Sequence, residues 1–99
     1  MKNEGSLRHR RAVIRAVLRY LITNPEAKDT IKGVRKWWLP EGYREQPQDE
    51  LEESLRFLVS KNWLTGRVVS QQKIYGLNKD SIEQIQHYLK HADDEEETW

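Results

Sequence analysis

The chain has 99 residues and no cysteine, with 36% hydrophobic and 33% charged residues and a formal net charge of +1. This length predicts one domain with a thin core, and the absence of cysteine excludes disulfides, thiolate metal sites and cysteine nucleophiles. No apolar run approaches the roughly 20 residues that cross a bilayer, and the first residues lack the apolar stretch of a secretory signal. We expect a cytoplasmic protein that does not contact membranes.

The charge is unevenly distributed along the chain. Residues 1–19 are strongly basic, whereas residues 93–97 are all acidic. Adjacent carboxylates repel one another and bury nothing. We therefore expect a domain over residues 1–92 and a disordered acidic tail over residues 93–99.

Apolar residues recur at helical spacing in the first part of the chain. A first helix is predicted over residues 7–23, with Ser6 as its cap and Asn24-Pro25 as its end. A second helix over residues 30–39 begins at Asp29 or Thr30 and is broken by Pro40. Residues 41–48 have no apolar period and are predicted to form a loop.

The second part of the chain predicts a helix, a hairpin and another helix. Asp49 and Glu52 have the spacing of a capping box, and a leucine stripe follows over residues 49–61. Residues 67–69 and 73–77 favour strands around a polar turn at residues 70–72. Asp80 and Glu83 repeat the capping-box spacing before a fourth helix that ends near His91.

One part of the sequence is similar to the winged-helix family, over residues 55–64, 67–69 and 74–78. In that family the third helix ends, an apolar pair enters a strand, and an aromatic residue and a leucine close the wing. The element order over residues 7–89 also resembles this family, and residues 29–34 with 37–39 are similar to a segment of small bacterial winged-helix proteins. The resemblance implies a mainly α fold with a small β-hairpin, in the α+β class: a winged-helix-like three-helix core, a two-stranded wing and a C-terminal fourth helix.

The resemblance also implies DNA binding through the third helix and the wing, often in a dimeric transcription regulator of the helix-turn-helix type. Winged helices also serve as protein-binding modules, so the fold alone does not decide the partner. Four acids crowd the start of the third helix: Asp49, Glu50, Glu52 and Glu53. DNA phosphates would repel them, although the same acids also complement the helix dipole.

Basic residues offer a DNA-binding surface elsewhere. Arginines recur every three or four residues on the first helix, a second basic group lies on the second helix, and two more cations lie on the wing. The candidate phosphate contacts are Arg8, Arg11, Arg15, Arg19, Lys32, Arg35, Lys36, Arg67 and Lys73. The arginine stripe also fits an ordinary solvated face, an acidic protein, or the chain's own tail.

Aromatic residues suggest a protein partner or a homodimer as the alternative. Phe57 falls off the apolar stripe of the third helix, so it either packs under the wing or the second helix or anchors a partner. Trp38 and Trp63 are predicted to be core, and Trp37 lies at the edge of the apolar face. The candidate partner-binding residues are Glu50, Glu53, Phe57, Lys61 and Trp37.

Nothing in the sequence predicts catalysis. There is no paired nucleophile and base and no phosphate-cradling glycine loop. His87 and His91 stand four residues apart, a spacing that suits a metal, but a third firm ligand is missing. We expect no catalytic residue, no cofactor, no metal and no small-molecule substrate, and two hypotheses stay open: a DNA-binding domain or a protein-interaction module.

Overall fold

The computed structural model describes the backbone of residues 2–97 and the side chains of residues 9–91. A small three-stranded antiparallel sheet accompanies a mainly helical chain, which confirms the predicted α+β class. The elements in chain order are α1 (Lys2–Thr23), β1 (Lys28–Asp29), α2 (Ile31–Gly33), the π-helical η1 (Val34–Trp38), the 3₁₀ turn η2 (Glu41–Tyr43), α3 (Gln48–Ser60), β2 (Leu64–Val69), β3 (Gln72–Leu77), the 3₁₀ turn η3 (Lys79–Ser81) and α4 (Ile82–Glu97).

The core lies where α1 packs against α3. Both helices present a stripe of fully buried side chains, because their apolar residues recur every three or four positions. These stripes include Val13, Val17, Leu21, Leu51, Leu55 and Leu58. Each buried leucine or valine stabilises the fold by roughly 1.5–3 kcal/mol. The same cluster takes up Trp38 and Trp63, as the sequence predicts.

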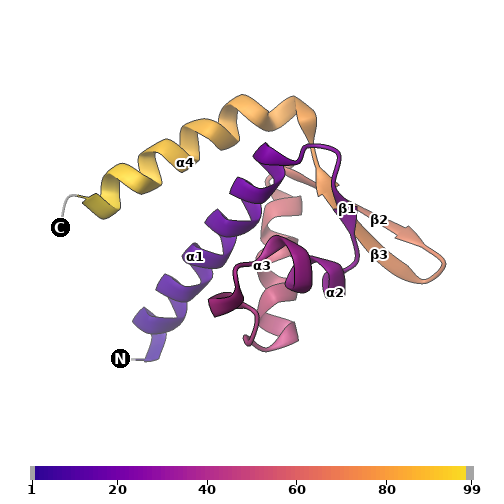
Figure 1. The fold of residues 1–99 in the computed structure, drawn as a ribbon, viewed down its shortest axis with the longest axis horizontal. Helices are drawn as coiled ribbons and strands as arrows, with labels where there is room; N and C mark the ends of the chain where they lie inside the picture. Colours follow the sequence, from indigo (N-terminus) through magenta and orange to yellow (C-terminus); the bar gives the residue numbers. More distant parts are fainter. Residues whose placement is uncertain (1, 98–99) are drawn as a thin grey trace.

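The β2–β3 hairpin projects from the helical body, opposite the free ends of α1 and α4 (Figure 1). Its strands pair from Leu64↔Leu77 to Val69↔Gln72. The turn is therefore only two residues long, Ser70 and Gln71, with φ of 50° and 68°. Two left-handed residues match the right-handed twist of the strands, and the long pairing offsets the cost of this backbone for residues other than glycine.

The sheet has the order β1-β3-β2, so β3 is its central strand. The two residues of β1 pair with Gly76 and Tyr75 of β3. This strand ties the connection between α1 and α2 to the hairpin. The sequence does not predict it, because two residues are too few to show an alternating pattern.

Two predicted helix caps are wrong. Pro47 occupies the cap position of α3, and the Asp49 carboxylate instead accepts a hydrogen bond from the N–H of Glu50. Proline suits a helix start because the first N–H groups lack intrahelical partners. Before the fourth helix, Asn78 caps the 3₁₀ turn η3, and its side chain accepts a hydrogen bond from the N–H of Asp80. The predicted loop at residues 41–48 contains η2 and the buried Gln46.

The two terminal helices are longer than the sequence predicts. The first begins at Lys2, so Ser6 lies inside it instead of capping it. The last continues past His91 to Glu97, where the sequence predicts a disordered tail, and residues 98 and 99 of that tail lie outside the described residues. Glutamate has a high intrinsic helix propensity, which favours the added turn of this last helix. Side chains beyond residue 91 lie outside the described residues.

Gly33 provides a test of how the start of α2 is held. A Cβ atom added there would lie 1.9 Å from the Cγ of Asp29, whose carboxylate accepts a hydrogen bond from the N–H of Thr30. We expect Gly33→Ala to lower the free energy of unfolding by about 1–3 kcal/mol through this overlap. Urea unfolding followed by circular dichroism measures it.

Gly42→Ala is the matched control, because nothing lies within 4 Å of a Cβ added at Gly42. It should leave the free energy of unfolding nearly unchanged. Equal effects of the two substitutions would show that Asp29 does not restrict position 33.

Candidate nucleic-acid interface

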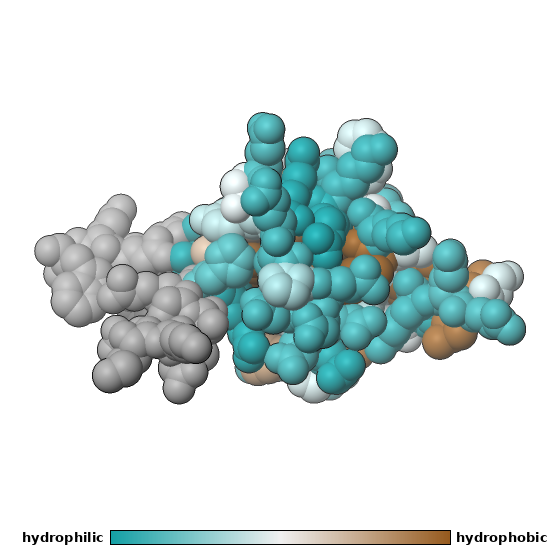
Figure 2. All heavy atoms as spheres, turned by 90° about the horizontal axis from the view of Figure 1, so that it is seen from below, coloured by the Kyte–Doolittle hydropathy of each residue, from teal (hydrophilic) through white to brown (hydrophobic). Residues whose placement is uncertain are grey.

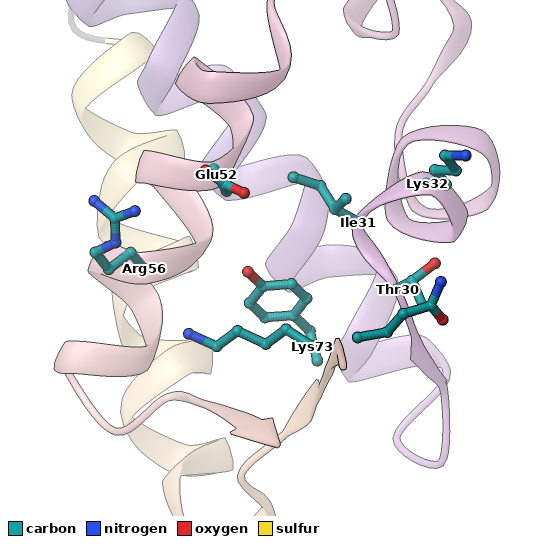
Figure 3. A pocket seen from close by; sticks show the side chains of 8 residues that line it. Thr30, Ile31, Lys32, Glu52, Arg56 and Lys73 are labelled. Atoms are coloured by element: carbon teal, nitrogen blue, oxygen red, sulfur yellow. The ribbon is translucent and has the colours of Figure 1, made fainter. Parts of the chain in front are cut away.

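An open concavity of about 290 Å³ lies between α2, α3 and the hairpin (Figure 3). Three cations border it, each from a different element: Lys32 from α2, Arg56 from α3 and Lys73 from β3. In Figure 3 the charged groups of Arg56 and Lys73 point to one side, and Lys32 lies at the opposite rim. Glu52 is the carboxylate among the lining residues. The concavity is therefore predominantly basic.

Local hydrogen bonds fix the α2 rim of this concavity. The Thr30 hydroxyl caps α2 by accepting from the N–H of Gly33 at 3.5 Å, and the Thr30 carbonyl accepts from the N–H of Val34. Asp29 Oδ1 accepts from the N–H of Thr30 at 2.9 Å. These contacts hold the turn that carries Lys32.

Gly66 of β2 has no side chain, and this makes room for the side chain of Lys73. Gly66 pairs with Tyr75, and Val68 with Lys73, so all four residues share one face of the hairpin. A Cβ atom at Gly66 would lie 2.7 Å from the Cε of Lys73. The lysine stem therefore crosses the sheet above Gly66, and its Nζ lies 5.6 Å from the centre of the Tyr75 ring.

The four acidic residues at the start of α3 do not all face the concavity. Glu53 faces away from the concavity and pairs with Arg10 of α1 at 2.9 Å. Asp49 and Glu50 are exposed at the start of the helix, and Glu52 is half-buried beside the concavity. Burial raises the pKa of the Tyr75 hydroxyl, Glu52 raises it further, and Arg56 opposes part of this shift.

The predicted phosphate contacts do not form one surface. Lys32 and Lys73 border opposite sides of the α2–α3–hairpin concavity, together with Arg56, which was not among the candidates. Arg67 pairs with Ile74 on the other face of the hairpin. Arg15 and Arg19 border a separate groove beside η1. Helical spacing places cations on one side of a helix, but it does not say which elements lie beside that side.

The remaining basic candidates have local roles or lie apart. Arg35 donates to the carbonyl oxygen of Arg44 at 3.1 Å. The Nζ of Lys36 lies 5.1 Å from the centre of the Trp37 ring. Arg11 is exposed on α1, and the Arg8 side chain lies outside the described residues.

Two predicted partner-binding aromatics are exposed. Phe57 on α3 is 49% exposed, so it is only partly packed, and the Nζ of Lys61 lies 5.5 Å from its ring centre. Trp37 is 60% exposed. The hairpin adds Val68 and Val69, which are 71% and 50% exposed and which the sequence predicts only as strand residues. Figure 2 shows a largely hydrophilic face with a few apolar spots, one of them on the hairpin.

The two histidines of α4 lie close to each other. The His87 and His91 rings lie 4.2 Å apart, and no group of three potential metal-ligating residues occurs in this part of the chain. Within the same residues, no helix has both the length and the apolar character to span a membrane.

Comparison with protein-family models, curated proteins and solved structures found no significant match. The winged-helix resemblance therefore stays a prediction.

Tyr75 gives the concavity a measurable pH dependence. The raised pKa means that the folded chain holds the phenolic proton more tightly than the unfolded chain does. This contribution to stability is complete below about pH 10, the ordinary pKa of tyrosine, and is lost as the pH rises through the folded value. We expect the free energy of unfolding to fall more steeply above about pH 10 in the unmodified chain than in Tyr75→Phe.

Urea unfolding across this pH range measures the difference in the free energy of unfolding between the two chains. The other titrating groups are common to both chains, so their contributions cancel in the comparison. Spectrophotometric titration of Glu52→Gln should show the pKa of Tyr75 moving back towards its ordinary value. Identical pH dependence in the unmodified chain and Tyr75→Phe would contradict the burial of the phenol.

Proposed function

We propose that this chain is a non-catalytic, winged-helix-like module that binds duplex DNA through the concavity between α2, α3 and the hairpin. The sheet order β1-β3-β2 supports this, as does the succession of α2, α3 and a two-stranded hairpin. In such an arrangement α2 and α3 are the helix-turn-helix pair and β2–β3 is the wing.

One observation carries the proposal: Lys32, Arg56 and Lys73 come from three separate elements and border the same open concavity. Their charges suit a phosphate backbone, since such contacts supply most of the affinity in non-specific DNA binding. Thr30 and Gln72 add uncharged hydrogen-bonding groups on the same lining.

The acidic residues of α3 limit its contacts with the bases of a DNA duplex. Asp49 and Glu50 are exposed in the first turn of α3, and phosphates would repel them. Binding therefore depends on phosphate contacts at the rim, with few groups left for base edges. We expect weak sequence preference and a strong dependence on salt.

The salt dependence tests this interface directly. Three phosphate contacts predict that the logarithm of the binding constant falls with the logarithm of salt concentration with a slope of about −2.7. Lys73→Gln should make this slope shallower by about 1. Anisotropy of a labelled duplex across a salt series measures both.

Lys90→Gln is the matched control, because Lys90 is exposed on α4 and does not border the concavity. It should leave the slope nearly unchanged. No detectable binding at about 50 mM salt, or an equal effect of the two substitutions, would contradict the proposed interface.

A protein-interaction module is the second candidate function, and exposed Phe57 is the observation that favours it. Glu50 and Glu53 precede Phe57 by seven and four residues, so helical spacing places them on the same side of α3. An exposed aromatic with charges of both signs nearby, here Glu50 and Lys61, is suited to a protein contact.

Self-association through Phe57 can be measured by sedimentation velocity. If copies of the chain pair through this face, Phe57→Ala should convert dimers to monomers while lowering the free energy of unfolding by less than about 1 kcal/mol. Val69→Ala is the control, since Val69 is 50% exposed on the hairpin. A large loss of stability in Phe57→Ala would instead show that the ring belongs to the core.

A further inference from the structure

A second groove, of about 450 Å³, runs between α1 and the segment that contains η1 and η2. It shares no lining residue with the basic concavity described above. Three arginines border it: Arg15 and Arg19 of α1, and Arg44 after η2. None of its described lining residues is acidic. This groove therefore carries a more uniform positive charge than the α2–α3–hairpin concavity.

The rest of the lining is apolar. Ala12 and Ala16 lie one turn apart on α1, so their small side chains leave the groove open. Leu39 and Pro40 continue the lining on the opposite side. Trp37 lies at the groove with 60% of its surface exposed. The groove thus combines an apolar lining with guanidinium groups.

The position of Arg44 is fixed by backbone contacts. Its Nε donates to the carbonyl oxygen of Leu39 at 3.0 Å, and its own carbonyl oxygen accepts from Arg35 at 3.1 Å. These bonds leave the outer nitrogens of Arg44 for further contacts. Arg15 and Arg19 already have interactions within the chain, but each guanidinium has five donors, so a ligand can be added beside them.

We propose that this groove binds an acidic peptide segment of a partner protein, with carboxylates on Arg15 and Arg19 and an apolar side chain against Trp37. Guanidinium groups suit carboxylates because they offer paired donors in one plane. The exposed indole and the alanine lining suit an apolar anchor between those carboxylates. This surface acts independently of the proposed DNA interface.

Single-stranded nucleic acid fits the groove less well, because most of its aromatic rings are already engaged. Such ligands stack successive bases on exposed rings. Here Tyr20 stacks on Trp38 with ring centres 5.7 Å apart and planes at 16°, and Tyr43 meets His9 edge to face at 5.7 Å. Trp37 has Lys36 over its ring but remains 60% exposed. The groove offers one exposed ring, enough for one anchor but not for a row of bases.

Anisotropy with three labelled probes tests this inference on the full chain. The probes are a short peptide that alternates glutamate with leucine, a peptide of the same length and charge with serine in place of leucine, and an oligothymidylate. The glutamate–leucine peptide should bind most tightly. Trp37→Ala and Arg19→Gln should each weaken it about tenfold, as expected for loss of an anchor or a charge-assisted contact.

Arg67→Gln is the matched control, since it removes one positive charge on the far face of the hairpin and should leave peptide binding unchanged. Circular dichroism confirms that each variant is folded, which the exposure of Trp37 and Arg19 favours. Tighter binding of oligothymidylate would make the groove a nucleic-acid site and overturn the inference. Equal binding of the two peptides, no binding of either, or an equal loss in Arg67→Gln would overturn it as well.

Discussion

One face of α1 is completely buried against the rest of the chain. Val13, Val17 and Leu21 share a single cluster with the leucines of α3, and α1 also contacts η1, α4 and β3. In a core this small, burial of each side chain is a large fraction of the total stability. The position of α3 relative to the hairpin, and therefore the shape of the concavity between them, depends on this contact.

The same packing separates the basic residues into distinct surfaces. The buried stripe of α1 leaves its other sides to Arg15 and Arg19, which border the groove beside η1. The hairpin has two faces, so Lys73 lies towards α3 and Arg67 lies away from it. Two partners of different chemistry are therefore compatible with one small domain.

Much of the fold could be predicted because it depends on local patterns. The helices have apolar periods, and the hairpin has two β-favouring runs around a polar turn. The strand at Lys28–Asp29 is too short to leave a pattern, and it depends on pairing with Gly76 and Tyr75 of a distant segment. The predicted cap of α3 is wrong for a different reason. Asp49 has the spacing of a capping residue, but the helix already begins after Pro47.

The candidate site was less predictable, because charge in the sequence does not show how charges meet in space. The acids of α3 predict a helix face that repels phosphates. However, the charge of Glu53 is paired with Arg10, which is 43 residues away in the sequence. Arg56 is not among the phosphate contacts that the sequence predicts, although it borders the concavity together with Lys73. Only the packing of α3 against the hairpin brings these cations together.

The most direct test of the proposed interface is to map it residue by residue, by following the NMR resonances of the labelled chain while a short DNA duplex is added at low salt. The account predicts that the largest shifts fall on Lys32, Arg56 and Lys73, with Arg15, Arg19 and Trp37 little changed. Shifts concentrated in the groove beside η1, or no shifts at any residue, would contradict it.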